Sequence, residues 1–265
     1  MAMSLEQAVE ILRREVFELR NKLGLLTSLT GQEAEVERLW SGYLYNQVGM
    51  PAVTGIQKGN AVVNLYPTPK VSVITPASRG TRYLHNLLDA MHEQTYRDFE
   101  HIIIYDGPPN SDVKELLKDH PGFIIIPKSP DKHPGTTPRN EGIKAARGEW
   151  LCFADDDDHY NDNWIQMLVT GAIESAVTLT QASFSMRRIK PDADKKKQIL
   201  LPDRPEIVPG RIGTPCFMVR REHALECPWQ DEPNHDFWFL KRIIDKFNLT
   251  IQFHPGCTVV VQEHE

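Results

Sequence analysis

Short apolar runs alternate with stretches of helical spacing between residues 70 and 160, and this alternation constrains the fold more than any other feature. The runs occupy 71–75, 101–105, 122–126 and 150–154, and the helical spacing lies at 83–92 and 140–147. This pattern is typical of parallel sheets with helical crossovers, whose strands are buried on both faces. The sequence therefore predicts an α/β fold with an open, mostly parallel, Rossmann-like sheet flanked by helices.

Polar residues follow the predicted strands. Ligands of doubly wound sheets bind outside the carboxyl ends of the strands, and these ends carry Thr75, Asp106 and Asp155. Asp106 precedes a glycine, so it either starts a turn or accepts hydrogen bonds from a nucleotide base or ribose. Arg139 opens the helix before the last of these strands, and from there a guanidinium can reach a base or a phosphate.

Four aspartates, Asp155 to Asp158, directly follow the apolar run at 150–154. Adjacent carboxylates repel one another, and at a strand end this arrangement is costly unless a cation compensates. Mg²⁺ and Mn²⁺ prefer oxygen ligands, and Mg²⁺ is usually bound by one or two carboxylates together with substrate phosphates. The run therefore indicates a metal-bridged phosphate ligand. The alternative is a solvated acidic turn in which Asp158 caps a helix.

Composition narrows the class of protein. The 265 residues are enough for one large domain, or one domain with an appendage, and the formal net charge of −6 argues against a nucleic-acid partner. No stretch approaches the roughly 18 consecutive apolar residues of a membrane-spanning helix, so we expect no integral membrane segment. The four cysteines form no CxxC pair, and the charged N-terminus lacks the apolar core of a secretory signal. We therefore expect reduced thiols and a cytoplasmic location.

A heptad seam marks the N-terminal part of the chain. Leucine and valine recur at intervals of four and three from Leu5 to Leu26, and capping boxes open this helix at Ser4 and a second one at Thr30. Residues 1–50 are thus predicted to form a helical hairpin, which is either the arm of a homo-oligomer or packed on its own catalytic domain. Residues 51–69 contain several prolines and glycines, and we expect a linker there with a short strand at 61–65.

The pattern after residue 165 is less regular. It predicts strands at 182–188, 217–220, 250–253 and 258–261, and an amphipathic helix at 236–247.

Three segments in this order resemble a family-2 glycosyltransferase of the GT-A fold: VSVITP at 71–76, QTYRDFEHIIIYD at 94–106 and RNEGIKAARGEWLCFADDDD at 139–158. Weaker matches run to the C-terminus, and the first 65 residues lie outside the resemblance. It implies a glycosyltransferase domain at 70–265, with a nucleotide-binding half at 70–160 and an acceptor-binding half at 161–265. It also implies a nucleotide-diphosphate sugar donor, in the first place a UDP-sugar, and Mn²⁺ or Mg²⁺ as cofactor.

The resemblance gives roles to single positions of this chain. The implied nucleotide site consists of Pro76, Ala77, Ser78, Asp106, Arg139, Asp155 and Asp156. Asp157 would bind the metal, and His264, at the end of a late strand, is a candidate ligand with His254 as its rival. The family usually has Tyr-Asn where this chain has Ser78-Arg79, so Arg79 is a candidate to lie over the base in place of an aromatic ring.

An inverting transfer also needs a general base for the acceptor hydroxyl. The family places it in a Glu-Asp pair before an aromatic-rich helix, and His235-Asp236 occupies that position here, so Asp236 is the implied base. The alternative is an aspartate that only caps the helix. Gly213, Trp229 and Trp238 are candidates to line a sugar site, although a tryptophan among apolar neighbours is more often part of the core.

The expected function is a metal-dependent, inverting glycosyltransferase of hexosyltransferase type that acts on the hydroxyl of a glycan or another acceptor. Two alternatives stay open. A nucleotidyltransferase would use similar acids and a metal, but the segment 75–80 offers only Arg79 and one glycine where such enzymes have a glycine-rich, basic phosphate loop. In a non-catalytic oligomeric scaffold, the heptad arm would be the active part.

Overall fold

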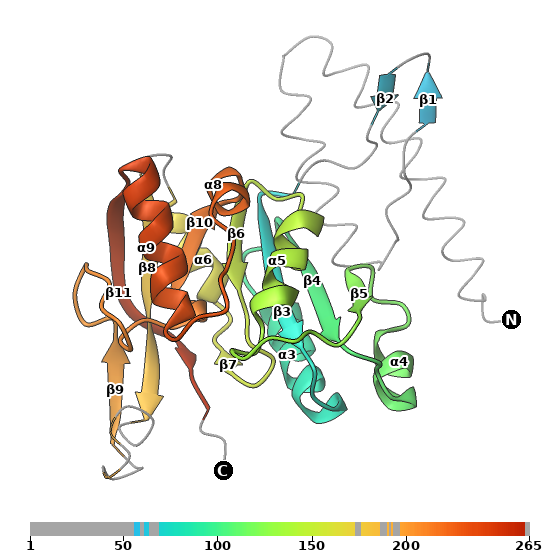
Figure 1. Ribbon diagram of the computed structural model, residues 1–265, viewed down its shortest axis with the longest axis horizontal. Coiled ribbons are helices and arrows are strands. Elements are labelled where there is room, and N and C mark those ends of the chain that lie inside the picture. Colours follow the sequence, from blue (N-terminus) through green and yellow to red (C-terminus); the bar gives the residue numbers. More distant parts are fainter. Residues whose placement is uncertain are drawn as a thin grey trace, which may run out of the picture. The chain divides into compact units, whose positions relative to one another are not determined.

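The computed structural model describes residues 56–58, 61–63, 69–172, 176–185, 190, 192 and 197–262 (Figure 1). The helical hairpin expected at 1–50 lies outside these residues. The chain divides into two compact units, and in one of them β1 (Ile56–Lys58) pairs antiparallel with β2 (Ala61–Val63). β2 is the short strand expected at 61–65.

The other unit holds everything described from residue 69 onward. Its strands are β3 (Val71–Ala77), β4 (Phe99–Asp106), β5 (Phe123–Ile126), β6 (Trp150–Phe153), β7 (His159–Tyr160), β8 (Ala176–Ser185), β9 (Gln198–Leu201), β10 (Phe217–Arg220) and β11 (Thr250–Val260). Its helices are α3 (Thr81–Glu93), α4 (Ser111–Leu117), α5 (Thr136–Ala145), α6 (Trp164–Thr170), α8 (Arg221–Glu226) and α9 (His235–Phe247), with a 3₁₀ turn, η1, at Thr214–Cys216. None of the helices described has both the length and the hydropathy required to cross a bilayer.

One sheet runs through this unit in the order β5-β4-β3-β6-β10-β8-β11-β7, and β9 pairs with β8. The strands β5, β4, β3 and β6 are parallel to one another, which confirms the parallel sheet predicted for 70–160. β10 enters antiparallel between β6 and β8, and β11 returns parallel to β8. The carboxyl ends of the parallel strands and the first residues of β10 therefore lie at one edge, the lower edge in Figure 1.

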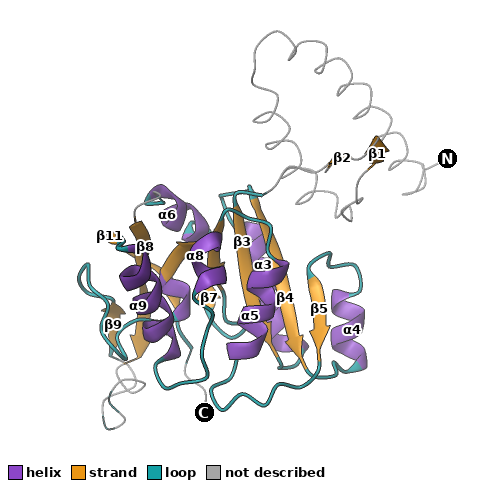
Figure 2. Cartoon of the chain, turned by 45° about the horizontal axis from the view of Figure 1, so that its top comes forward, coloured by secondary structure: helices purple, strands orange, loops and turns teal. Residues whose placement is uncertain are grey.

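The parallel strands are buried because helices cover both faces of the sheet. Figures 1 and 2 show α5, α8 and α9 in front of the strands and α3 and α6 behind them. α3 presents Leu84, Leu87 and Met91 to the core at helical spacing. α5 lies closer still, since a Cβ on Gly142 would overlap the side chain of Ile74 in β3. This close approach holds α5 against the strand that leads to the edge.

Most expected boundaries lie within two residues of those observed, and three differ by more. The first late strand begins earlier, as β8, and the two strands expected at 250–253 and 258–261 are a single one, because β11 continues through a register shift between Phe253 and Cys257. α5 begins at Thr136 and not at residue 140. The earlier start is stabilised by Asp131, whose carboxylate accepts hydrogen bonds from the Thr137 N–H and Oγ1, both at 2.7 Å.

Candidate active site

The residues expected at the nucleotide come together where the parallel strands end. Asp106 is the last residue of β4, and the aspartate run 155–158 follows β6 closely. α5 and α9 begin at the same edge, because Arg139 of α5 contacts Asp155, and Asp236 in the first turn of α9 interacts electrostatically with both. Four elements thus bring acids and a buried arginine to one place.

Arg139 is buried and held on several sides. Its Nη2 donates to Asp155 Oδ1 at 2.6 Å, and its guanidinium carbon lies 5.0 Å from the ring centre of Trp229. Gly135, which precedes α5, has a φ of 92°, and a Cβ there would overlap the guanidinium. The second oxygen of Asp155 accepts from Thr214 Oγ1 at 2.7 Å. Asp155 is therefore fixed between α5 and η1.

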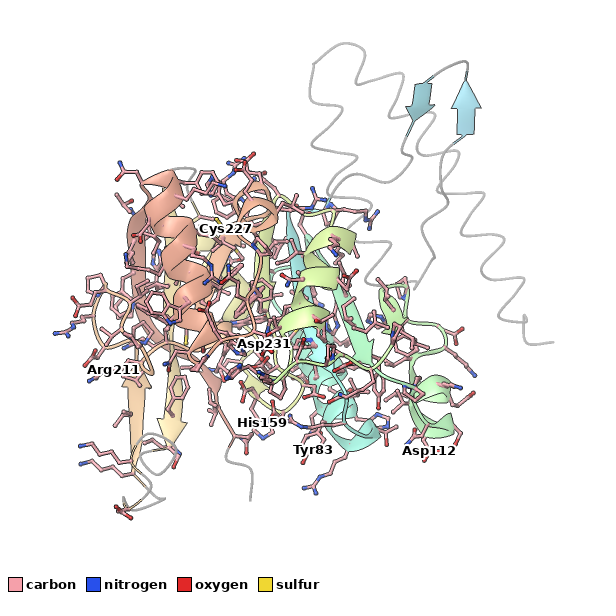
Figure 3. The ribbon with its side chains drawn as sticks, viewed as in Figure 1. Tyr83, Asp112, His159, Arg211, Cys227 and Asp231 are labelled. Carbon is pink, nitrogen blue, oxygen red and sulfur yellow. The ribbon has the colours of Figure 1, made fainter. Side chains whose placement is uncertain are left out.

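Arg79, in the loop after β3, forms ion pairs with the two middle aspartates. Its Nη1 lies 2.9 Å from Asp156 Oδ1 and also contacts Asp157 Oδ2. The same guanidinium lies over the ring of Tyr83, at 5.4 Å from its centre. The side chain expected to lie over a base therefore faces the acids in this structure. Figure 3 shows Tyr83 on α3, below the end of the sheet.

Asp156 carries a buried carboxylate that is only partly paired. Its Oδ2 is buried without a hydrogen-bond partner. Burial raises the pKa of Asp156 to about 7 against the opposing effect of Arg79, and the neighbouring Asp157 and Asp155 raise it further. A buried carboxylate of this kind gains stability from any cation that reaches it.

Asp156 and Asp157 fit a divalent cation for two reasons. They offer carboxylate oxygens, and a positively charged group, the Arg79 guanidinium, already contacts both of them. In the part of the chain that the structure describes, no group of three or more His, Cys, Asp or Glu side chains is arranged to hold a metal ion. Phosphate oxygens or water would have to complete the coordination, as is common for Mg²⁺. His264 lies outside the described residues, and its rival His254 packs in β11 beside Gly171.

Asp158 has a different role from its neighbours. It is buried, and its Oδ1 accepts a hydrogen bond from the Gln262 N–H at 3.0 Å. The next helix, α6, begins only at Trp164 with Asn163 before it, so the interpretation of Asp158 as a helix cap is wrong. Asp158 instead connects the acidic run to the segment that follows β11.

Asp106 accepts three hydrogen bonds from the loop after β5. The donors are the Ser129 N–H at 2.6 Å, Ser129 Oγ at 2.8 Å and Lys128 Nζ at 2.9 Å. Burial would raise the pKa of Asp106, but these bonds outweigh it and lower the pKa. The carboxylate is therefore ionised. The Lys128 side chain is 64% exposed, so it can move aside for a ligand that donates to the same oxygen.

Residues 76–78 form the end of β3 and the start of the loop that follows it. Pro76 and Ala77 are the last residues of the strand, and Ala77 lies opposite Tyr105 of β4, while Ser78 is exposed. The Tyr105 hydroxyl donates to the Arg79 carbonyl oxygen at 2.9 Å. The main chain of this loop is thus anchored independently of the Arg79 side chain.

Asp236 and its neighbour His235 begin α9. Asn234 occupies the N-cap, and Asp236 Oδ1 accepts from the Phe237 N–H at 3.2 Å. Burial raises the pKa of Asp236 to about 6, although Arg139 opposes this. Burial and Arg139 also lower the pKa of His235 to about 4, so its imidazole is neutral near pH 7. A partly desolvated carboxyl with this pKa is suited to accept a proton near neutral pH.

Two sets of hydrogen bonds join α5 and the loop before it to the segment before α9. Asp231 accepts from the N–H groups of Lys132, at 2.9 Å, and of His133, at 2.7 Å, and Figure 3 shows it between α5 and α9. Asn140 Nδ2 donates to the Trp229 carbonyl, and its Oδ1 accepts from the Trp229 N–H, both at 2.9 Å. These contacts fix the position of Asp236 relative to Arg139.

The three candidate sugar-site residues differ in their exposure to solvent. Trp229 is 2% exposed and stacks on Phe239 with ring centroids 4.2 Å apart, so it is part of the core. Trp238 is 42% exposed on α9. Gly213 is buried and precedes η1.

Several residues of the site were not expected from the sequence, namely Thr214, Lys128, Ser129 and Asp231. Thr214 and Asp155 are 59 residues apart, and Asp231 and His133 are 98 apart, so no local pattern relates them. The only signal was their position beside glycine, proline or charged residues in loops that border the predicted strands.

Comparison with known proteins finds relatives of this domain. A profile described as "Glycosyl transferase family 2" matches residues 72–247. The chain is 27% identical over 161 residues to "Uncharacterized glycosyltransferase EpsJ" of Bacillus subtilis (strain 168), and the match covers 60% of this chain and 44% of EpsJ.

Solved structures show the same fold. The S. aureus TarS 1–349 structure in complex with UDP-GlcNAc is 19% identical with a TM-score of 0.55, covering 74% of this chain and 59% of TarS 1–349. The mannosyltransferase PcManGT from Pyrobaculum calidifontis, in complex with GDP-Man and Mn²⁺, is 14% identical with a TM-score of 0.53, covering 86% of this chain and 66% of PcManGT. These likenesses confirm the GT-A fold. In each case the match spans less than two thirds of the relative's length.

Proposed function

This chain belongs to glycosyl transferase family 2, and from this premise we propose that it moves a sugar from a nucleotide-diphosphate sugar to an acceptor hydroxyl, with Mn²⁺ or Mg²⁺ and with inversion. One observation carries the proposal. The aspartates after β6, the buried Arg139 and the desolvated Asp236 come from separate elements and meet at the carboxyl edge of the sheet. This edge is where ligands of open α/β sheets bind.

The middle aspartates are the proposed metal ligands. Asp157 and Asp156 would hold the cation, which would neutralise charge on the departing nucleoside diphosphate. Asp155, held by Arg139 and Thr214, would accept a hydrogen bond from the ribose. Arg139 holds Asp155 in its orientation through their hydrogen bond, and it supplies positive charge beside the phosphates.

Asp236 is the proposed general base. It would accept the proton of the acceptor hydroxyl at a carboxylate oxygen while the hydroxyl oxygen bonds to the sugar carbon and the bond from that carbon to the diphosphate breaks. A single displacement of this kind inverts the configuration at the sugar carbon. Asn140 supports this role, because its two hydrogen bonds to Trp229 hold the segment that leads into α9.

The donor is proposed to be a UDP-sugar, with a GDP-sugar as the alternative. TarS 1–349 was solved with UDP-GlcNAc and PcManGT with GDP-Man. An ionised Asp106 at the end of β4 favours a base with a ring N–H donor, which both uracil and guanine have. Lys128, beside Asp106, can donate to a carbonyl oxygen of either base.

A calorimetric titration tests the donor site. The protein is titrated with UDP, GDP, CDP and TDP, with and without Mn²⁺, and Asp157→Ala serves as the comparison. We expect metal-dependent binding of one nucleotide that is lost in Asp157→Ala. Absence of binding under every condition would contradict the proposal and favour the scaffold alternative.

Product analysis separates transfer from nucleotidyl transfer. Release of a nucleoside diphosphate from a nucleotide sugar supports the proposal, and release of pyrophosphate supports the nucleotidyltransferase. Two further expectations stay predictions, a homo-oligomer formed through residues 1–50 and a location in the cytoplasm. Removal of residues 1–50 followed by light scattering tests the first of them.

A further inference from the structure

The position of Arg79 has a consequence for how a cation reaches the acids. Its guanidinium contacts Asp156 and Asp157, the two carboxylates proposed to bind the metal. Both side chains are strongly buried, at 6% and 9% exposed, whereas the Arg79 side chain is 39% exposed. The two carboxylates are thus shielded from solvent, whereas the arginine has solvent on one side.

We propose that Arg79 is a built-in counter-ion for Asp156 and Asp157, which the divalent cation must displace, and that the displaced guanidinium then pairs with the diphosphate of the donor. This inference rests on the proposed function. It adds a residue that couples metal binding to donor binding.

Displacement must be an exchange of one cation for another. If Arg79 left alone, two adjacent buried carboxylates would lose the positive charge that Arg79 supplies, which is unfavourable. If the metal arrived while Arg79 stayed, two cations would lie beside the same two carboxylates and repel each other. Each carboxylate oxygen that contacts Arg79 is therefore unavailable to the metal until the side chain moves.

The loop is built so that only the side chain needs to move. The Arg79 carbonyl accepts a hydrogen bond from the Tyr105 hydroxyl at 2.9 Å, and this anchor does not involve the guanidinium. The Tyr83 ring, 5.4 Å from the guanidinium carbon, offers a face along which it can move. The backbone at the end of β3 can therefore stay in place during the exchange.

The diphosphate is the partner that the chemistry favours for the released guanidinium. A guanidinium presents paired N–H donors that match two phosphate oxygens, and such pairs are stronger than neutral hydrogen bonds. A nucleotide at the end of β3 would bring its phosphates to the acids that bind the metal. The metal releases the guanidinium that pairs with the diphosphate, and the diphosphate pairs with the guanidinium that the metal displaces. Metal and nucleotide would therefore each favour the binding of the other.

The test compares wild type with Arg79→Gln, which keeps a polar side chain but removes the charge. Arg82→Gln is the matched control, because Arg82 lies three residues on, is exposed, and loses the same charge. Mn²⁺ binding is followed by electron paramagnetic resonance of the free ion at pH 8. It is measured without nucleotide and with whichever of UDP and GDP wild type binds more tightly. Circular dichroism and Tm confirm that each variant is folded.

We expect Arg79→Gln to bind Mn²⁺ alone about tenfold more tightly than wild type, since a charge-assisted contact no longer has to be broken. We expect the same variant to bind the Mn²⁺–nucleotide pair about tenfold more weakly, and to lose most of the coupling between them. Arg82→Gln should behave like wild type in both titrations.

Equal or weaker Mn²⁺ binding by Arg79→Gln, with wild type binding Mn²⁺ normally, overturns the Arg79 proposal and leaves the proposed function standing. A parallel change in Arg82→Gln also overturns it, because the effect would then be one of general charge. If neither wild type nor Arg79→Gln binds Mn²⁺, with or without nucleotide, the metal-dependent function fails and the Arg79 proposal fails with it.

Discussion

Replacement of Asp236 by Asn should nearly abolish transfer and at the same time stabilise the fold. Asn keeps the size of the side chain and the oxygen that accepts from the Phe237 N–H, but it cannot take a proton from an acceptor hydroxyl. General bases contribute roughly 10²- to 10⁴-fold to rate, so we expect turnover to fall by about that factor. Nucleotide binding should be unchanged.

The stabilisation follows from the raised pKa of Asp236. Burial brings this pKa to about 6 from the ordinary value of 3.8. A raised pKa means that the folded protein favours the protonated acid, so this contribution to stability is present below about pH 4 and is lost as the pH rises through about 6. At 1.36 kcal/mol per pKa unit, the loss is at most about 3 kcal/mol above that range.

Two measurements check this prediction together. Nucleoside diphosphate release gives kcat for both proteins, and for wild type kcat/KM should fall with unit slope below about pH 6 because the base becomes protonated. Urea unfolding at pH 8 and at pH 4 gives the difference in stability, which should favour Asp236→Asn at pH 8 and vanish at pH 4. An aspartate that only supports the helix N-terminus predicts the opposite sign at pH 8. Turnover within tenfold of wild type, with a variant less stable at pH 8, would refute the assignment.

Three further changes test the site. Asn140→Ala removes both hydrogen bonds to the Trp229 main chain, and urea unfolding should show a loss of about 1–3 kcal/mol; unchanged stability would mean that the segment before α9 is held elsewhere. Gly135→Ala places a Cβ against the Arg139 guanidinium at a φ of 92°, and calorimetry should show weaker nucleotide binding in a folded protein; intact affinity would contradict the role of Arg139. Asp106→Asn loses the charge that Lys128 and Ser129 pair with, and discrimination among UDP, GDP, CDP and TDP should narrow. If the preference persists, Asp106 does not recognise the base.

The parallel half of the sheet was predictable because its signals are local. Each buried strand is a short apolar run, and its ligand-facing residue follows directly after it, so the sequence alone places Asp106 and Asp155 at one edge. Arg139 could be placed near them because it lies in the helix that leads into β6.

The contacts among these residues could not be predicted in the same way. Arg79 and Asp156 are 77 residues apart, and their pairing depends on the path of the loop after β3. The place of β10 in the sheet depends on tertiary packing, and only that placement brings Thr214 to Asp155. The resemblance indicated which residues share the site, but not which of them form hydrogen bonds or ion pairs with one another.

The direction of β10 also bears on how this domain can diversify. In a purely parallel sheet, only the loops that leave the carboxyl ends of strands reach the ligand edge. An antiparallel strand instead begins at this edge, so the loop before it reaches the ligand. The segment that leads into β10 therefore contacts the acidic run, where Thr214 donates to Asp155. Insertions in the exposed stretch 203–206 could lengthen that loop without altering the register of the parallel strands. Under the proposed function, acceptor preference and nucleotide preference would then be able to change independently.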